Sequence, residues 1–358
     1  MKKHNFSSGP AILPAEVMIE AAEAVKELDD IGLSILEISH RSEAFSSILA
    51  EAIALVKELL HLPKGYEVLF LTGGASSQFY MTAMNLLDDA GTAAYVDTGS
   101  WSTKAIKEAS LFGKIEVIAS SKDQNFSYIP KGYDVPDSAS YLHLTSNNTI
   151  YGTQFKDWPE TNVPFVCDMS SDIFSQPIDI DRFGLIYAGA QKNLGPSGTT
   201  LVIVREDMLG KVSRTIPTML DYTTHIKKRS AFNTPPTFPI YVCLLTLRWL
   251  ERNGGVEKMA EQNLAKAQLL YDAIDANPLI QGKVNREDRS LMNVSFVMAD
   301  GHEDKESIFW EMCEAADCSG IKGHRTVGGF RASIYNAMPV KSIEVLIDVM
   351  NDFANKYA

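Results

Sequence analysis

The chain has 358 residues, of which 45% are hydrophobic and 22% charged, so it can bury the core of two domains or of one large α/β unit with an appendage. Its 33 basic residues against 45 acidic ones give a formal net charge of −12, which argues against a nucleic-acid partner because that class needs a basic face. No apolar run is long enough to cross a bilayer, so a membrane partner is not expected either. An anionic substrate stays compatible with this balance, since a few arginines in a cleft set the local field.

Four cysteines have neither metal-binding nor disulfide spacing: Cys167, Cys243, Cys313 and Cys318. We therefore expect reduced, mostly buried thiols and no metal site. The first residues lack the apolar stretch of a secretory signal peptide, so a cytoplasmic protein is expected.

The first two thirds of the chain alternate between helical and strand patterns. Helices are predicted where apolar residues recur every three or four positions, over residues 15–28, 46–60, 78–87 and 102–113. Strands are predicted where short apolar runs rich in β-branched residues occur, over residues 66–72, 93–99, 114–120, 140–146, 164–170, 184–189 and 199–206. Such runs are typical of strands buried on both faces, and strands separated by helices predict a mainly parallel sheet.

The last third predicts a second, smaller domain. A helix over residues 239–255 ends on the pair Gly254–Gly255, as a helix C-cap does. The next segments in chain order are a helix over 256–276, a strand over 291–298, a helix over 305–316, a strand over 329–335 and a helix over 342–357. We predict a large domain of residues 16–262 and a small domain that joins residues 1–15 to residues 263–358.

Chemically suggestive residues follow several of the predicted strands. The glycine turn 73–76, Thr149, Asp168 and Lys192 each come just after an apolar run. Because parallel-sheet proteins bind ligands beyond the carboxyl ends of their strands, neighbouring strands would bring these residues into one cleft. A lysine kept neutral by burial is a nucleophile, and with an aldehyde cofactor such as pyridoxal phosphate it forms a Schiff base.

That cofactor also needs a carboxylate at its pyridine nitrogen, backbone N–H groups for its phosphate and a flat side chain over its ring. Asp168, the helix that follows turn 73–76, and Trp101 are candidates for these three tasks. Each residue has an ordinary reading as well: Lys192 as a solvated turn residue, Asp168 as a helix cap, Trp101 as core, and 73–76 as a plain turn. Their joint occurrence in this order favours the cofactor site.

Separated sequence blocks resemble the phosphoserine aminotransferases, which are class V pyridoxal-phosphate enzymes of fold type I. The resemblance runs almost end to end, through NFSSGPAILP, ILEISHR, GGASSQF, DTGSW, NNTIYG, CDMSSD, IYAGAQKNLGPSG, FNTPPTFPIY and KGHRTVGGFRASIYNAMP. It implies an α/β fold in which a large domain has a mainly parallel mixed sheet flanked by helices, beside a smaller α+β domain.

The resemblance also implies roles at the cofactor ring. Lys192 would form the Schiff base and shuttle the proton between substrate and cofactor. Asp168 would pair with the pyridinium nitrogen, Trp101 would stack on the ring, and Thr149 would bond the phenolic oxygen.

For the cofactor phosphate, the resemblance implies the backbone amides of Ala75 and Ser76 and the side chain of Gln191. Asn233 and Thr234 would reach that phosphate from the neighbouring subunit, in a homodimer with shared active sites. Some relatives carry an arginine after the glycines, where this chain has Ser76. Any help that arginine gives must come from elsewhere here.

Recognition of a phosphorylated amino acid needs several fixed cations, because the substrate carries both a carboxylate and a phosphate. The resemblance assigns Arg331 to the carboxylate and His40, Arg41, His324 and Arg325 to the phosphate. A single His–Arg pair is ordinarily a surface feature. Two such pairs are harder to dismiss, and they would explain an amino-terminal segment that folds against the carboxy-terminal domain.

The implied reaction is reversible transamination between O-phospho-L-serine with 2-oxoglutarate and 3-phosphohydroxypyruvate with L-glutamate, in serine biosynthesis. The 4-phosphohydroxy-L-threonine of pyridoxine biosynthesis is a further candidate substrate. One alternative is another class V enzyme, such as an alanine–glyoxylate aminotransferase or a cysteine desulfurase using Cys313 or Cys318. A cofactor-binding sensor is a second alternative, but it needs a basic DNA-binding module, and the fold motifs already begin by residue 5.

Overall fold

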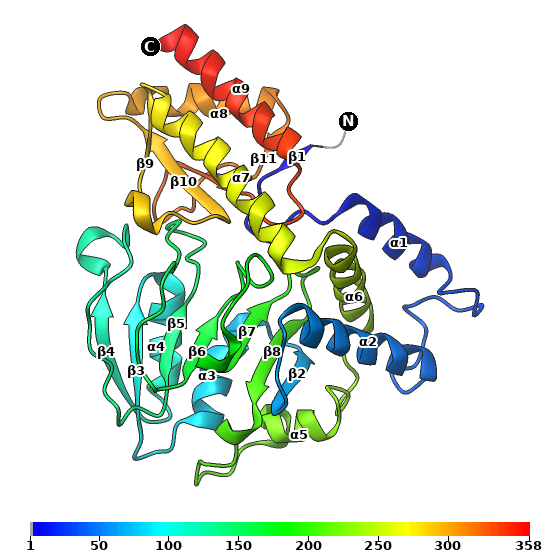
Figure 1. Cartoon of the computed structure of the whole chain (residues 1–358). Coiled ribbons are helices and arrows are strands. Elements are labelled where there is room, and N and C mark those ends of the chain that lie inside the picture. Colours follow the sequence, from blue (N-terminus) through cyan, green and yellow to red (C-terminus); the bar gives the residue numbers. More distant parts are fainter. Residues whose placement is uncertain (1–2) are drawn as a thin grey trace.

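Seven strands form the larger sheet of the computed structural model, which describes residues 3–358. Their spatial order is β2-β8-β7-β6-β5-β3-β4 (Figure 1). The strands are β2 (Tyr66–Leu71), β3 (Thr92–Asp97), β4 (Lys114–Ser120), β5 (Leu142–Thr145), β6 (Phe165–Asp168), β7 (Phe183–Gly189) and β8 (Thr200–Arg205). β8 runs antiparallel to both of its neighbours, and the other strand pairs are parallel. The predicted mainly parallel mixed sheet is confirmed.

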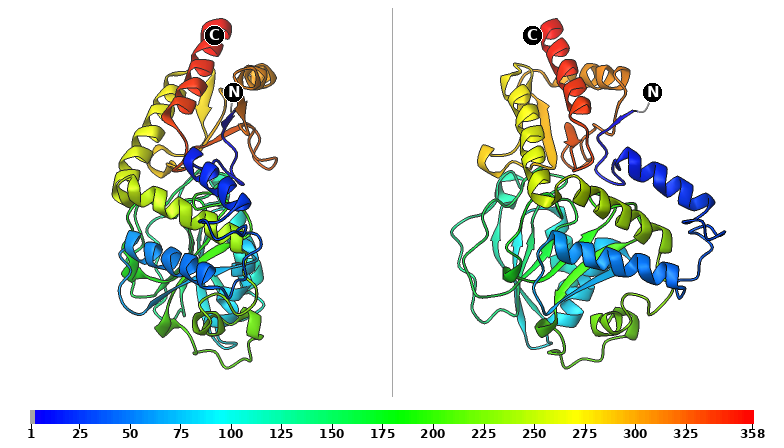
Figure 2. Two further views of the ribbon diagram at one scale, coloured as in Figure 1. Left: turned by 90° about the vertical axis from the view of Figure 1, so that its right-hand side faces the viewer. Right: turned by 45° about the vertical axis from the view of Figure 1, so that its right-hand side comes forward.

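Helices cover both faces of this sheet, because successive strand residues point to opposite sides and nearly all are apolar. One face packs against α1 (Ala15–Lys26), α2 (Glu43–Leu59) and α6 (Thr237–Arg252). Both views in Figure 2 show α2 and α6 side by side. The other face packs against α3 (Gly74–Leu86), α4 (Ser100–Ala109) and the short α5 (Tyr222–Lys227).

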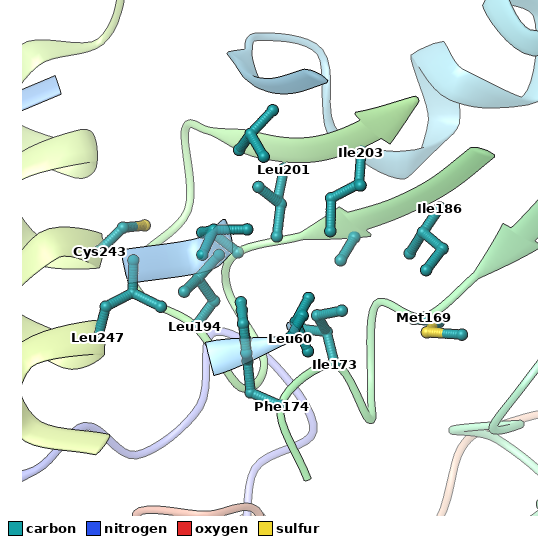
Figure 3. Close-up of a cluster of buried hydrophobic side chains, with 14 of the residues drawn as sticks. Leu60, Met169, Ile173, Phe174, Ile186, Leu194, Leu201, Ile203, Cys243 and Leu247 are labelled. Atoms are coloured by element: carbon teal, nitrogen blue, oxygen red, sulfur yellow. The ribbon is translucent and has the colours of Figure 1, made fainter. Parts of the chain in front are cut away.

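The core between α6 and the sheet is apolar throughout. Leu201 and Ile203 of β8 lie with Ile186 of β7 on the same side as Cys243 and Leu247 of α6 (Figure 3). Residues of the turn after β7 join the same cluster, so the turn that carries Lys192 rests directly on the core.

A smaller antiparallel sheet has the order β12-β10-β9. Its strands are β9 (Ile280–Gly282), β10 (Asn293–Met298) and β12 (Phe330–Ser333), and its helices are α7 (Gly255–Ala276), α8 (Glu306–Ala315) and α9 (Val340–Tyr357). The core of this unit is aromatic: the ring of Phe296 lies 5.4 Å from that of Phe330, and Phe309 lies 5.1 Å from Phe353. α7 passes through residue 262 without a break, so the domain boundary near that residue stays a prediction.

The amino-terminal segment folds against the small sheet unit through main-chain pairing. β1 (His4–Asn5) runs parallel to β11 (Cys318–Ser319), with His4 opposite Cys318. Our expected reason for this docking was wrong, because the two His–Arg pairs take no part in it. The chain then crosses toward the large sheet, where Ala11 N–H donates to the carbonyl of Gln191 at 2.9 Å.

Within residues 3–358, no helix combines the length and apolar character that crossing a membrane requires.

Candidate active site

The carboxyl ends of β5, β6 and β7 bring three of the predicted residues together. Thr149 follows β5, Asp168 ends β6 and Lys192 lies in the turn after β7. Lys192 Nζ donates to Thr149 Oγ1 at 2.5 Å and lies 5.6 Å from the centre of the Trp101 ring. The predicted convergence of these side chains is therefore present in the single chain.

Lys192 is a half-buried amine with an altered proton affinity. Burial lowers its pKa from 10.5 to about 8, although the Asp168 carboxylate opposes that change. The nearby charge of Arg331 lowers the pKa further. A substantial fraction of the amine is thus neutral near pH 8, as a nucleophile requires.

The residues after Lys192 hold its turn in place. Asn193 Nδ2 donates to the carbonyl of Ile173 at 2.6 Å, and the side chain of Leu194 packs in the core shown in Figure 3. The buried side chains of Asn193 and Leu194 therefore fix the position of the Lys192 backbone.

Asp168 is a buried carboxylate in a polar turn. The backbone N–H of Ser170 donates to its Oδ1 at 2.9 Å, and Ser146 Oγ donates to its backbone oxygen at 3.0 Å. Burial raises the pKa of Asp168, while the Lys192 charge and the Ser170 bonds lower it. The alternative role of Asp168 as a helix cap does not hold, because no helix begins near Ser170 and the Ser170 bond closes a turn.

Trp101 lies in the first turn of α4, with its ring toward Lys192. The start of this helix is fixed by Ser102, whose Oγ donates to Asp97 Oδ1 at 2.8 Å and accepts Gly99 N–H at 2.9 Å. Trp101 Nε1 is buried and has no hydrogen-bond partner among the described residues. On the same helix, Lys104 Nζ lies 4.4 Å from the centre of the Trp101 ring.

The glycine turn forms the start of α3. Gly73 and Gly74 have φ values of 98° and 67°, and the helix begins at Gly74 rather than at the predicted residue 78. Ala75 and Ser76 therefore lie in the first turn, where backbone N–H groups have no partner within the helix. A helix N-terminus of this kind favours an anion.

The remaining predicted phosphate ligands lie in two places. Gln191 is half-buried next to Lys192, and a Cβ at Gly189 would come within 2.7 Å of Gln191 Oε1. Asn233 and Thr234 are exposed, and Asn233 shares a surface pocket with Gly73 of the same chain.

Arg331 lies on β12 and faces Thr149 across the gap between the two sheets. Its side chain is buried: Nη2 donates to Ser8 Oγ at 2.8 Å and Nη1 donates to the Thr149 carbonyl at 3.4 Å. Burial lowers the pKa of Arg331, and its Nε has no partner among residues 3–358. No acidic side chain of the described chain pairs with this guanidinium, so its charge is available for an anion.

Other basic side chains lie near Arg331. His324 and Arg325 lie in the loop before β12. Burial lowers the pKa of His324, and the charges of Arg331, Arg325 and Lys104 lower it further. The positive charge of this region therefore comes from Arg331, Arg325 and Lys104, and the lowered pKa favours a neutral His324 among them.

The single chain does not bring His40 and Arg41 to this region. They directly precede α2, which packs against α6 and β2. The first turn of α2 lies at the outside of the molecule, away from the carboxyl ends of β5–β7 (Figure 1). Five residues were predicted to bind substrate, and three of them, His324, Arg325 and Arg331, lie near one another in the single chain.

Sequence reasoning missed two contributors to the site. Lys104 looked like any charged residue of an amphipathic helix, and only the fold shows that it faces Trp101 and His324. Ser8 gave a weak signal as part of the block NFSSGPAILP, although no role was assigned to it. Its hydroxyl accepts the Arg331 bond, and its carbonyl accepts a bond from Tyr335 Oη at 2.8 Å.

A cysteine nucleophile does not fit the structure. Cys313 and Cys318 are buried, and burial raises the pKa of both thiols, that of Cys318 to about 11. A reactive cysteine needs an accessible thiolate. Cys318 is also fixed in the β1–β11 pair, so the desulfurase alternative loses its candidate residues.

Comparisons with known proteins identify the family of the chain. Residues 3–346 match the family described as Aminotransferase class-V. The curated phosphoserine aminotransferases of Flavobacterium johnsoniae and Parabacteroides distasonis are each 56% identical over 357 residues, covering 99% and 100% of this chain and the whole of each relative.

Solved structures give the same result. The phosphoserine aminotransferase from Bacillus circulans subsp. alkalophilus has a TM-score of 0.96 and 48% identity, covering 100% of this chain and 99% of that one. An alanine–glyoxylate aminotransferase from Nostoc sp. has a TM-score of 0.75 at 14% identity, covering 98% of this chain and 95% of that one, which is likeness of fold alone. The chain belongs to the phosphoserine aminotransferase family of class V aminotransferases.

Proposed function

We propose that this enzyme transfers an amino group reversibly between O-phospho-L-serine with 2-oxoglutarate and 3-phosphohydroxypyruvate with L-glutamate, in serine biosynthesis. One observation carries the proposal: Lys192, with a lowered pKa, lies between Trp101 and Thr149 and opposite Arg331, whose guanidinium pairs with no acid of the described chain. In this arrangement the guanidinium can bind the carboxylate of an amino acid whose amino group reacts close to the Lys192 amine.

Pyridoxal phosphate fits this site as the cofactor. A buried carboxylate, a neutral amine, an aromatic face with an unpaired N–H and a helix N-terminus are the four groups that its ring and phosphate require. When bound, the cofactor supplies an electron-withdrawing ring that stabilises negative charge at the substrate Cα. We assign its phosphate to the Ala75 and Ser76 amides and to Gln191.

Each residue around the ring then has one task. Lys192 holds the cofactor aldehyde and moves the proton at the substrate Cα, for which a pKa of about 8 suits a general base. Asp168 keeps the ring nitrogen protonated, since a cation beside a buried carboxylate favours its ionised form. Thr149 Oγ1 orients the amine of Lys192 and the phenolic oxygen of the cofactor.

Substrate recognition follows from the distribution of cations. We assign the substrate carboxylate to Arg331, because a planar guanidinium binds a carboxylate through two parallel bonds. The substrate phosphate belongs to His324 and Arg325, together with His40 and Arg41. The last two reach a phosphate only from a second copy of the chain, since α2 holds them away from the Arg331 of their own chain.

A homodimer with shared sites follows from this proposal. Large apolar side chains close in sequence to His40 and to Asn233 are exposed in the single chain: Leu36 is 59% exposed and Phe232 39%. A second copy that covers them would deliver His40 and Arg41 to the neighbouring site, and Asn233 and Thr234 to the neighbouring cofactor phosphate. Apolar residues beside functional ones are a common feature of obligate interfaces.

We extend the proposal to 4-phosphohydroxy-L-threonine, and so to pyridoxine biosynthesis, because it presents the same carboxylate, amine and phosphate to the same cations. We also propose a cytoplasmic location, which the four buried, unpaired cysteines support.

A screen of amino donors tests the proposal. Phosphoserine, serine, alanine and aspartate are compared at equal concentration with 2-oxoglutarate as acceptor, by following glutamate formation. The phosphate contacts predict that kcat/KM for phosphoserine exceeds that for serine by roughly 100-fold, the effect of about two charged hydrogen bonds. Equal use of serine or alanine would contradict the proposed substrate.

A further inference from the structure

Lys266 is a buried cation that the proposed chemistry does not use. It lies in the middle of α7 with 3% of its surface exposed. Its Nζ donates to three backbone carbonyls, those of Ile334 at 3.2 Å, Tyr335 at 2.8 Å and Asn336 at 3.4 Å. No carboxylate of residues 3–358 forms an ion pair with it, and burial lowers its pKa to about 7.

Such an arrangement is costly unless every donor is used. In its protonated form the amine has three N–H donors, and three carbonyls of one short stretch of main chain after β12 lie within hydrogen-bond distance of it. The structure of the site depends on that stretch, because two of its residues lead to the two ends of the proposed substrate site.

The first connection runs to Arg331. Tyr335 Oη donates to the carbonyl of Ser8 at 2.8 Å, and Ser8 Oγ accepts from Arg331 Nη2 at 2.8 Å. Lys266 therefore holds the backbone of Tyr335, and the Tyr335 side chain in turn holds Ser8, the hydrogen-bond partner of Arg331.

The second connection runs to Lys192. The backbone N–H of Asn336 donates to Asn193 Oδ1 at 2.9 Å, and Asn193 is the residue after Lys192. The Asn336 side chain is held in turn by α7, since Asn263 Nδ2 donates to Asn336 Oδ1 at 2.8 Å. Two residues of α7 thus bind Asn336: Lys266 bonds to its carbonyl and Asn263 to its side chain. The backbone N–H of Asn336 donates to Asn193, next to Lys192.

We propose that Lys266 is a positioning residue that sets the distance between the Lys192 amine and the Arg331 guanidinium by holding residues 334–336 between them. The inference rests on the proposed function, because only a substrate bound at both ends needs that distance to be fixed. Misplacing a reacting group by about 1 Å costs on the order of 100-fold in rate, so a few lost main-chain bonds are enough to be measured.

The test replaces Lys266 by methionine, which keeps the length and removes the donors, in the cofactor-loaded enzyme. The matched control is Lys258→Met, which removes an exposed lysine from the same helix. For Lys266→Met we expect KM for the amino donor to rise roughly tenfold with a smaller fall in kcat, because binding at both ends is what the distance controls. Hydrogen exchange at the amides of residues 334–336 should become faster, while Lys258→Met should change neither quantity.

A purely structural lysine gives a different result: a lower melting temperature with KM and the exchange of residues 334–336 as in the wild type. That outcome would overturn the inference. Lys266→Gln retains two N–H donors, so its KM and its amide exchange at residues 334–336 should lie between those of the wild type and of Lys266→Met. If the methionine variant does not fold, the same measurements are made on the glutamine variant. If the wild-type enzyme itself ignores phosphoserine, the proposed function fails, while the exchange data and the KM for whichever donor is used still decide the role of Lys266.

Discussion

Lys192 Nζ lies 2.5 Å from Oγ1 of Thr149, although the two residues are 43 positions apart and follow different strands. The contact exists because β5 and β7 flank β6 in the sheet, so the segments after all three strands open on the same edge. The reactive amine is thereby aimed at the gap between the sheets instead of at solvent.

The pH dependence of cofactor binding should follow the lowered pKa of Lys192. Because that pKa is about 8 rather than 10.5, the neutral amine is present above pH 8. In protein freed of cofactor, the rate of combination with pyridoxal phosphate, measured by stopped-flow absorbance, should rise from pH 6 through a midpoint near pH 8 and level off above about pH 9. Asp168→Asn removes a charge that raises the pKa, so its midpoint should move to lower pH. A midpoint near 10 would contradict this assignment.

Arg331→Ala should weaken every amino acid substrate, phosphorylated or not, because the guanidinium is assigned to the carboxylate that all of them share. Loss of one partner of a buried charge pair costs about 2–5 kcal/mol, so kcat/KM should fall at least roughly 30-fold. Steady-state assays with phosphoserine and with glutamate as donors measure it. If only phosphoserine were affected, Arg331 would bind the substrate phosphate and not the carboxylate. The control is Arg252→Ala, which removes an exposed arginine from α6 and should leave kcat/KM unchanged.

Lys104→Met should act only on phosphorylated donors. Lys104 faces Trp101 and contributes to the positive region around His324, but it is exposed and its effect is screened. We expect KM for phosphoserine to rise roughly threefold at low salt, with the difference vanishing near 1 M salt. Lys107→Met, an exposed lysine on the same helix, should leave KM unchanged. Equal effects of the two variants would mean a general loss of surface charge.

Mixing two inactive variants should restore activity if sites are shared. One chain carries His40→Ala and Arg41→Ala, and the other carries Lys192→Ala. In a mixed dimer, one of the two sites has an intact lysine together with an intact His–Arg pair from its partner. After unfolding and refolding the mixture together, activity should reach roughly a quarter of the wild-type value, since half of the dimers are mixed and half of their sites work. Activity no higher than that of the separate variants would show that each site uses its own His40 and Arg41.

Much of this architecture could be predicted from the sequence, because strands buried on both faces appear in it as short apolar runs. The runs at 66–72 and 184–189 match β2 and β7 closely. The start of α3 was placed four residues late, at 78 instead of 74, because Gly74, Ala75, Ser76 and Ser77 are small and give no helical periodicity.

Other features depend on groups that are distant in sequence. The direction of β8 is one, since an apolar run carries no sign of parallel or antiparallel pairing. The position of Lys104 is another, because its neighbours His324 and Arg331 belong to a different sheet unit. His40 and Arg41 are a third case, because a single chain does not mark which surface residues the proposed second copy would use.

The β1–β11 pair joins residues more than 300 positions apart, since His4 lies opposite Cys318. Contacts between residues so distant in sequence form slowly, because the entropy of closing the loop is lost before the contact stabilises it. Ser8 reaches Arg331 only through this closure, so the large sheet can be complete while the guanidinium still lacks its hydroxyl partner. On the proposed roles of these residues, we therefore expect the ability to bind the substrate carboxylate to appear after the ability to bind the cofactor ring.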